Sequence, residues 1–504
     1  MSPRTSLALA AILVALPTLA QEQRPDEADL FGGETSQQEA PFPAEEEQPP
    51  QQPPPAPEGA EEGRDSQALG GTPPPDAFAS AEAVDDPLKI GGRFYLRALT
   101  QANEGVSFGD TSFSAPTQID TYLDARPAER LRGFVLGRLS FDPTRLQGSS
   151  NPLQPSTSNV AAAPTVLLDQ AWLRFDIERQ VFITAGKQHV KWGTASIWNP
   201  TDFLSPQRRN PLEFIDVRTG ASMLKVHVPW EATGWNFYAI GLLDNAGPAN
   251  TLGEVGGAAR AELVFGETEV AASGVLVRGR KPRFGLDFSS GLGPFDVYGE
   301  LALQQGTDQP LFRLPEGVSI PDLIEDIRNS GRPPDLAALP IERYYPEGLT
   351  PQASAGLRYE FAYAENELAT VGVEYFFNST GYPTELAYPY LLFQGQFQPF
   401  FLGQHYAALY AFLLGPGSWD DTSLFLFNLG NLSDRSFITR LNVTQRVLRF
   451  LTVEAFAAVN YGRKGGEFRF ALDLPAFQVG GQPVPPTVVR APTVQLGVGL
   501  RIDI

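Results

Sequence analysis

The sequence predicts an all-β fold, a transmembrane antiparallel up-and-down β-barrel of about 18 strands, preceded by a disordered acidic, proline-rich tail. Three observations predict it. From residue 88 to residue 504, apolar and polar residues alternate in short runs. The connections between these runs sort by length. There is no cysteine, and after the first twenty residues no apolar run reaches the roughly 18 residues of a membrane-spanning helix, so disulfides and helical spans are excluded.

The alternation is clearest at the end of the chain. Every second residue from Val494 to Ile504 is apolar, and the residues between them are polar or glycine. Successive side chains of a strand point to opposite faces, so one face is apolar and the other is not. The run 294–305 shows the same pattern, with charged Asp296 and Glu300 on its polar face. A face with repeated charges needs a wet interior, as in a membrane barrel.

The connections give an independent argument for a barrel. Every even-numbered connection is short, whereas the odd-numbered ones include all the long loops, which favours turns in the periplasm and loops outside. Both chain ends are then expected in the periplasm. The predicted strands are 88–101, 116–125, 131–141, 165–177, 179–188, 219–229, 234–244, 255–266, 267–279, 283–290, 294–305, 351–363, 367–378, 403–415, 420–430, 435–448, 450–461 and 492–504.

Two segments precede the barrel, which we place at residues 87–504. Residues 1–20 have a basic start, an apolar run over Leu7–Leu16 and small residues at Thr18 and Ala20, which predicts a signal peptide cleaved after Ala20. Residues 21–86 hold 12 prolines and carry a net charge of −15, of the −20 of the whole chain. Such a segment is expected to be disordered. It is either a solubilising linker or a tether that docks a periplasmic partner.

The most distinctive motif follows the run 179–188. It reads Gly186-Lys187-Gln188-His189-Val190-Lys191-Trp192-Gly193, then Asn199-Pro200-Thr201-Asp202, Asn210-Pro211-Leu212-Glu213 and Arg218-Thr219-Gly220. This stretch resembles one found in Gram-negative porin-like barrels, including alginate-export-like porins and related uncharacterised barrel families. The specific resemblance covers about 35 residues, and implies the cell outer membrane as location and the barrel-assembly machinery as a partner. It departs at Ile504, where such families often carry the aromatic residue that the machinery reads.

The long loop that contains this motif is a candidate pore constriction. It mixes aromatic residues with cations and is long enough to fold into the lumen. A cationic constriction favours anionic solutes or an anionic polysaccharide. In the alternative interpretation, the aromatic residues form the interfacial girdle and the arginines face lipid headgroups. The candidate constriction residues are Lys187, Lys191, Arg208, Arg209 and Arg218.

A second long loop, 306–350, is predicted to contain a short helix at 321–329, because Leu323 and Ile327 lie four residues apart. It acts either as a lid or plug, or as an ordered surface cap.

No motif predicts an enzyme. The three histidines, His189, His227 and His405, have no recognisable catalytic spacing, and no metal or cofactor motif occurs. No basic stripe suggests nucleic-acid binding. The sequence therefore predicts a porin-like, anion-preferring channel for solutes or an exported polymer. The alternative is a barrel component of a larger envelope machine, for polysaccharide export or surface motility, with the acidic tail docking its partner.

Overall fold

The computed structural model describes residues 87–145, 163–243, 255–313, 341–364, 367–417, 419–474 and 476–504 without 480, 481 and 485, together with positions 325 and 329. The predicted signal peptide, the predicted tail and nearly all of the predicted helix at 321–329 lie outside these residues.

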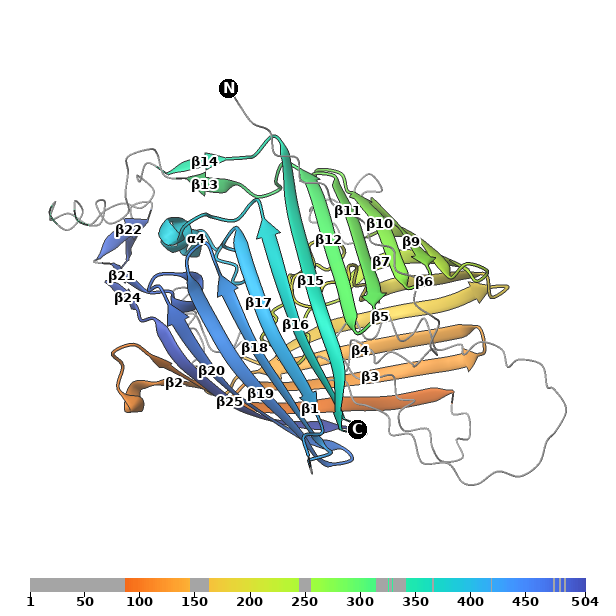
Figure 1. The fold of residues 1–504 in the computed structure, drawn as a ribbon, viewed down its shortest axis with the longest axis horizontal. Coiled ribbons are helices and arrows are strands. Elements are labelled where there is room, and N and C mark those ends of the chain that lie inside the picture. The colour runs from red at the N-terminus through yellow and green to blue at the C-terminus, as the bar shows by residue number, and fades with distance from the viewer. Residues whose placement is uncertain are drawn as a thin grey trace.

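Eighteen long strands form one sheet in which each strand pairs with its neighbours in the chain, and the short β2 (Ser112–Ser114) is added to the same sheet by pairing with β1 (Figure 1). The strands are β1 (Leu88–Asn103), β3 (Thr117–Ala128), β4 (Leu131–Phe141), β5 (Thr165–Ile177), β6 (Val181–Gln188), β7 (Ala221–Trp230), β8 (Trp235–Leu242), β9 (Gly256–Phe265), β10 (Thr268–Leu276), β11 (Arg283–Leu292), β12 (Phe295–Gln305), β15 (Leu349–Ala364), β16 (Glu367–Asn378), β17 (His405–Leu414), β18 (Thr422–Asn431), β19 (Ser436–Leu448), β20 (Leu451–Gly462) and β25 (Pro492–Asp503).

The sheet closes on itself, because the first strand pairs with the last. β1 and β25 are antiparallel, with Arg93 opposite Asp503 and Leu99 opposite Gly497. The backbones of Gly92 and Ile504 exchange hydrogen bonds of 2.9 and 2.8 Å at the end of this seam. Closure leaves the sheet without an unpaired edge. The predicted antiparallel barrel is therefore confirmed.

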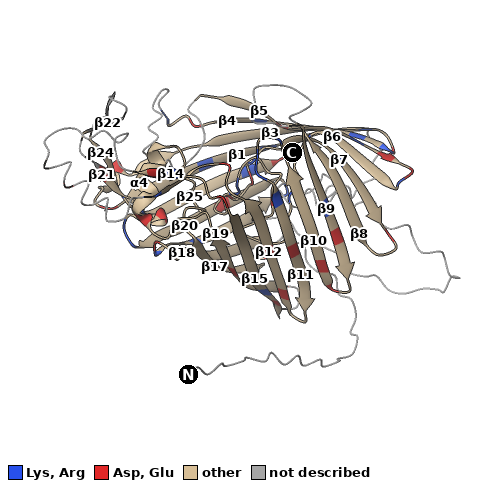
Figure 2. Cartoon of the chain, turned by 90° about the horizontal axis from the view of Figure 1, so that it is seen from above, with Lys and Arg blue, Asp and Glu red and all other residues tan. Residues whose placement is uncertain are grey.

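The two faces of the barrel wall have opposite character, as the alternation predicted. On β11, Leu286 points outward and is 53% exposed, whereas the neighbouring Asp287 points inward and is 3% exposed. Charged residues, blue and red in Figure 2, occur at intervals along strands that are otherwise uncharged. The outward face of β11 thus exposes apolar side chains to its surroundings, and its aspartate lies inside.

The lengths of the connections follow the predicted parity. The even-numbered connections have two to seven residues, and the longest connections, 189–220, 306–348, 379–404 and 463–491, are all odd-numbered. We call the two ends of the barrel the short-turn end and the long-loop end. Leu88 and Asp503 both lie at the short-turn end, because β1 starts and β25 finishes there.

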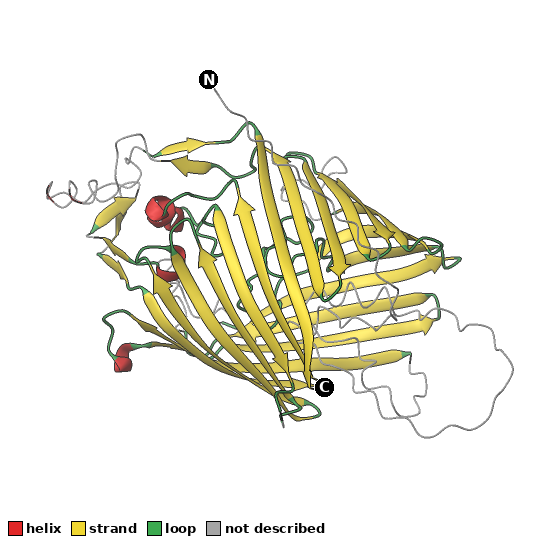
Figure 3. Ribbon diagram, viewed as in Figure 1, coloured by secondary structure: helices red, strands yellow, loops and turns green. Residues whose placement is uncertain are grey.

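Parts of three long loops form an ordered cap at the long-loop end (Figure 3). The first loop contributes the hairpin of β13 (Leu311–Arg313) and β14 (Glu342–Tyr344), and the second contributes helix α4 (Tyr388–Phe393). The third pairs β21 (Leu472–Leu474) with β24 (Thr487–Val489), and β22 (Phe477–Val479) with β23 (Gln482–Val484).

The cap has a small apolar core of its own, in which Phe312 and Phe470 pack against Tyr388, Leu391 and Leu402. The described part of loop 306–348 therefore belongs to an ordered cap. Among the described residues, no helix is long and apolar enough to cross a membrane.

Two glycines of the inner wall lie beneath tyrosine rings on the facing strand. Gly356 is opposite Tyr298, and Gly372 is opposite Tyr410. A Cβ at either glycine would collide with the ring. Ring and glycine thus fill one cross-strand space together, which fixes the position of both tyrosines close to the site described next.

Candidate functional site: a loop that lines the inside of the barrel

The connection between β6 and β7, residues 189–220, lies inside the barrel, and we call it the belt. Its side chains and backbone contact wall residues on strands far apart around the sheet: Arg97 on β1, Arg138 on β4, Glu300 on β12 and Glu374 on β16. A loop that touches all of these strands must follow the inner wall of the barrel. The belt therefore narrows the lumen.

Glu374 on β16 holds the first part of the belt. Its carboxylate accepts hydrogen bonds from three successive backbone N–H groups, those of Ser196 at 2.9 Å, Ile197 at 3.1 Å and Trp198 at 2.7 Å. The hydroxyl of Tyr298 donates a fourth bond of 2.8 Å. The Glu374 side chain is fully buried. Consecutive N–H groups aimed at one point form an anion-binding nest, here filled by a wall carboxylate.

A second wall carboxylate, Glu300 on β12, holds the neighbouring residues. It accepts the backbone N–H of Ala195 at 2.6 Å, the backbone N–H and hydroxyl of Thr201 at 3.1 and 2.7 Å, and the side-chain amide of Asn199 at 3.1 Å. Gly193 has φ +98°, and a Cβ there would collide with this carboxylate. The Trp-Gly and Asn-Pro-x-Asp motif of the sequence thus supplies the docking contacts of the belt.

Trp198 adds apolar contacts to the hydrogen bonds that hold this part of the belt. Its ring is 1% exposed, stacks on Phe376 with centroids 5.7 Å apart, and donates its Nε1–H to the carbonyl of Phe400 at 3.1 Å. Its own carbonyl accepts the hydroxyl of Ser354 on β15 at 2.7 Å. Trp192 is also buried, at 3% exposed. Both rings pack inside the barrel, so for these two residues the alternative of an outer aromatic girdle is wrong.

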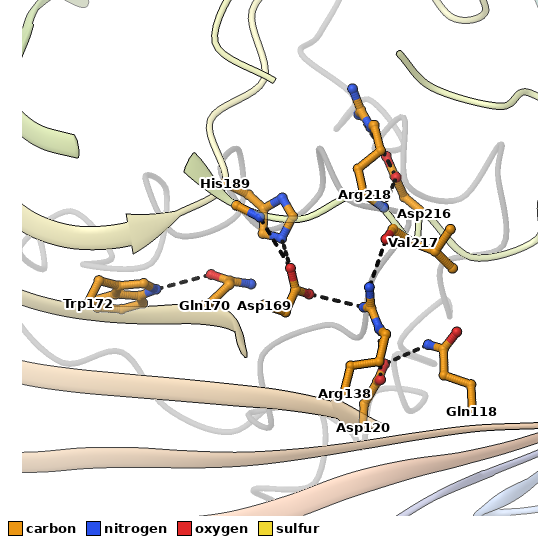
Figure 4. A network of polar contacts seen from close by, with 11 residues as sticks. Gln118, Asp120, Arg138, Asp169, Gln170, Trp172, His189, Asp216, Val217 and Arg218 are labelled. Carbon is orange, nitrogen blue, oxygen red and sulfur yellow. Dashed lines mark hydrogen bonds and ion pairs between the residues drawn. The ribbon is translucent and has the colours of Figure 1, made fainter. Parts of the chain in front are cut away.

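The last part of the belt returns along β1, β4 and β5. Glu213 pairs with Arg97 at 2.8 Å, and the carbonyl of Val217 accepts Arg138 at 2.8 Å. Arg138 also pairs with Asp120 at 2.9 Å and Asp169 at 3.0 Å, as Figure 4 shows. One arginine thus ties two wall strands to the belt.

Asp169 marks the place where the belt both leaves and rejoins the wall. Its carboxylate lies 2.9 Å from His189 at the start of the belt (Figure 4). It also accepts the backbone N–H of Gly220 at the end of the belt. The belt is therefore closed at its base by one buried side chain.

The five predicted constriction residues do not lie together. Lys187 is opposite Ala171 and Ser222, on the same face of the sheet as the exposed Leu173, so it points away from the lumen. Arg218 is buried between Asp216 at 2.7 Å and Asp202 at 2.8 Å. Burial disfavours its charge, but these two bonds keep its pKa above the ordinary value. Arg218 is therefore a paired, structural cation.

Arg208, Arg209 and Lys191 are on the belt itself. Arg209 donates to the carbonyl of Ser196 at 3.2 Å, and Lys191 is partly exposed. Arg208 is exposed to solvent, and its guanidinium carbon lies 4.2 Å from the centre of the Phe401 ring. The surrounding protein and the nearby Arg283 lower the pKa of Arg208 to about 10, so it is a cation at neutral pH. Water reaches the exposed guanidinium and keeps it charged.

The sequence did not single out the two anchors Glu300 and Glu374. The alternation assigned Glu300 to the polar face of its strand, but no local pattern links a wall carboxylate to a belt about 100 or more residues away.

The three histidines belong to the wall or to the base of the belt. His189 bonds Asp169, the Nε2 of His227 lies 2.9 Å from the Asn236 side chain, and the Nδ1 of His405 lies 2.6 Å from the hydroxyl of Tyr375. Within the described ranges, no group of three or more His, Asp or Glu side chains is arranged to hold a metal ion.

Comparison with solved structures returns porins. The chain is similar to OmpF of Salmonella typhi, in complex with daunomycin, with 10% identity and a TM-score of 0.39 over 84% of this chain and all of the other. It is also similar to OccK11 (OpdR) of Pseudomonas aeruginosa, with 11% identity and a TM-score of 0.45 over 83% of this chain and 96% of the other.

OpdK of Pseudomonas aeruginosa, with vanillate, matches with 10% identity and a TM-score of 0.44 over 82% of this chain and 98% of the other. At these identities the likeness concerns the fold alone. No protein-family model and no curated protein sequence matches the chain.

Proposed function

We propose that the chain is an outer-membrane channel in which the belt forms a constriction that favours anionic solutes. The single observation that carries the proposal is Arg208, a belt cation that is exposed to solvent and lies 4.2 Å from the ring of Phe401 on the 379–404 loop. An exposed side chain inside a closed barrel is in contact with lumen water. A fixed charge at such a position favours solutes of opposite sign.

The pairing of the acidic belt residues supports a constriction of positive charge. The belt has three acidic residues, and all three have cationic partners: Asp202 and Asp216 bond Arg218, and Glu213 bonds Arg97. The wall carboxylates that face the belt are occupied by its N–H groups. In the part of the chain that the structure describes, no carboxylate pairs with Arg208 or Lys191. The charge left for a passing solute is therefore positive.

A role as a component of a larger envelope machine is the second candidate, as the sequence suggested, with the acidic tail docking a periplasmic partner. In the channel proposal the short-turn end faces the periplasm. Catalysis is not part of the proposal, since the bonds of the three histidines are those of wall and loop residues.

The test is single-channel recording of the full chain in planar bilayers, with a potassium chloride gradient to obtain the anion-to-cation permeability ratio. We expect open steps and a ratio above one. Arg208→Gln is expected to lower the ratio by up to about fivefold, since one unit charge at a few ångströms in a water-like medium is worth about 1 kcal/mol. Lys187→Gln is the matched control, because Lys187 lies on the outward face.

The outcomes separate the candidates. A folded barrel that stays silent would contradict the channel and leave the machine component. A conducting barrel whose permeability ratio is the same in the wild type and in Arg208→Gln would contradict the cationic constriction.

A further inference from the structure

The short connection between β10 and β11, residues 277–282, concentrates exposed cations at the long-loop end of the barrel. It contains Arg278, Arg280 and Lys281, whose side chains are all exposed, and it contains no acidic residue. Among the residues that the structure describes, none of these three side chains has a carboxylate within ion-pair distance. We call this connection the cationic turn.

The backbone of the cationic turn is held in place by hydrogen bonds. The N–H of Arg280 closes a β-turn with a bond of 3.1 Å, and Gly279 has φ +76°, the left-handed conformation that glycine favours in such a turn. Asp308 in the loop after β12 accepts the backbone N–H of Lys281 at 2.8 Å and pairs with the side chain of Arg283 at 2.6 Å. The nearby carboxylate is therefore already occupied, and the three exposed cations remain available to a partner outside the chain.

Exposed apolar side chains flank the cationic turn on the outer surface of the barrel. Leu276, the last residue of β10, is 59% exposed, and Phe284, the second residue of β11, is 54% exposed. Both point outward, because their neighbours Val275 and Gly285 are buried. A connection this short cannot carry its cations far from these two side chains. The positive charges therefore lie at the rim of the outer surface, where the apolar part of the wall ends.

Beside Leu276, the outer surface of the wall is shallow. Gly257 on β9 lies opposite Leu276 and opposite Gly241 on β8, and Ala259 lies opposite Gly274. Nothing lies within 4 Å of a Cβ position at Gly241 or Gly257. An acyl chain that lies along this part of the wall can therefore approach its backbone closely.

We infer that the cationic turn binds lipids with anionic phosphate groups, in the leaflet at the long-loop end of the barrel. The phosphates lie at the level of the headgroups, within reach of Arg278, Arg280 and Lys281, and the acyl chains lie along Leu276 and Phe284. A soluble anion would match the charges but not the apolar side chains beside them, which favours a lipid. In the proposed orientation this leaflet is the outer one. Lipid binding at this turn does not require conduction, so the inference and the proposed channel can fail independently.

The experiment is native mass spectrometry of the full chain in detergent micelles, titrated with diphosphoryl lipid A, with phosphatidylcholine or with inorganic phosphate. Lipid A carries anionic phosphate groups on acyl chains, phosphatidylcholine has no net charge, and inorganic phosphate has no acyl chain. We expect the chain to bind lipid A more tightly than either of the other two. Arg278→Gln, Arg280→Gln and Lys281→Gln are each expected to weaken the binding of lipid A by about fivefold, the contribution of one cation at an anionic lipid surface, and the triple variant by more.

The control is Arg435→Gln, which removes a single exposed cation from the β18–β19 turn at the same end of the barrel and should leave the binding of lipid A unchanged. Heat-modifiable migration on gels verifies that each variant is folded. Equal affinities for lipid A and phosphatidylcholine, or a folded triple variant that binds lipid A as tightly as the wild type, would overturn the inference. Inorganic phosphate that binds as tightly as lipid A would also overturn it, because the turn would then be a site for a soluble anion.

Discussion

The carboxylate of Glu374 on β16 accepts the backbone N–H of Trp198 at 2.7 Å, across the inside of the barrel and 176 residues along the chain. Ser196 and Ile197 donate to the same carboxylate. The belt therefore depends on a wall side chain for the position of its backbone. Because the belt narrows the lumen, the width of the lumen depends on this wall residue.

Replacing Glu374 by alanine is expected to release the belt. Hydrogen bonds to a charged group are worth about 1.5–3 kcal/mol each, and three buried N–H groups would lose their acceptor. We expect a larger single-channel conductance and a smaller anion preference, because Arg208 would no longer be held in the lumen. Glu342→Ala is the control, since Glu342 is exposed on the β14 hairpin. An unchanged conductance in a folded Glu374→Ala barrel would contradict the anchoring role.

Gly193→Ala is expected to disturb the same anchor from the side of the belt. The residue has φ +98°, which costs an alanine about 1–2 kcal/mol, and the added Cβ would collide with Glu300. Gly105→Ala is the matched control, because Gly105 has φ +72° but nothing within 4 Å of its Cβ position. We expect the fluctuation of the open-channel current to rise in Gly193→Ala only. Equal noise in both variants would show that the collision with Glu300 has no effect on the belt.

The barrel could be predicted from the sequence, but the contacts inside the barrel could not. Alternation assigned Leu286 and Asp287 to opposite faces, because a strand has only two faces and lipid excludes charge. The belt contacts could not be predicted, because hydrogen bonds to Glu300 and Glu374 depend on the path of a loop through space.

Two of the predicted constriction residues show that the charge of a residue does not by itself predict a role in ion selectivity. Lys187 is polar but lies on the outward face at the end of β6, where a long side chain can reach the aqueous boundary. Arg218 is in the interior, but Asp216, two residues before it, already pairs with it. A cation contributes to selectivity only when no carboxylate is placed beside it, and that placement is set by the fold.

The cap is expected to weaken as pH rises from about 4.5 to 8. Glu467 is buried and accepts hydrogen bonds from the backbone N–H of Phe400, the hydroxyl of Tyr406 at 2.6 Å and the side-chain amide of Asn431 at 2.7 Å. Burial raises the pKa of Glu467 to about 8, with a further rise from Asp434. A carboxyl group with a raised pKa stabilises the folded state while it is protonated, and this contribution is lost as pH rises towards the folded pKa.

The groups facing Glu467 do not offset its charge. Asp434 in the β18–β19 turn has a pKa that burial raises as well, and the hydroxyl of Tyr388 in α4 lies in the same cluster. The arginines on the same loop point elsewhere, with Arg463 paired to Glu385 and Arg469 to Glu104. Hydrogen exchange of residues 395–404, corrected for intrinsic rates, should therefore be faster at pH 9 than at pH 6. Glu467→Gln is expected to remove most of this difference; if the variant keeps it in full, another group is responsible.

A charge on the outward face should impair membrane insertion according to its depth. Leu286 lies near the middle of β11 and is 53% exposed, so Leu286→Arg is expected to cost about 2–4 kcal/mol if this face contacts lipid. Leu349→Arg at the start of β15 adds the same charge at a strand end, where the cost falls to about 0–1 kcal/mol. The measurement is the urea dependence of folding into lipid vesicles, followed by gel migration. Equal midpoints for the two variants would mean that the outward face is not a lipid-contacting surface, since water would solvate both arginines alike.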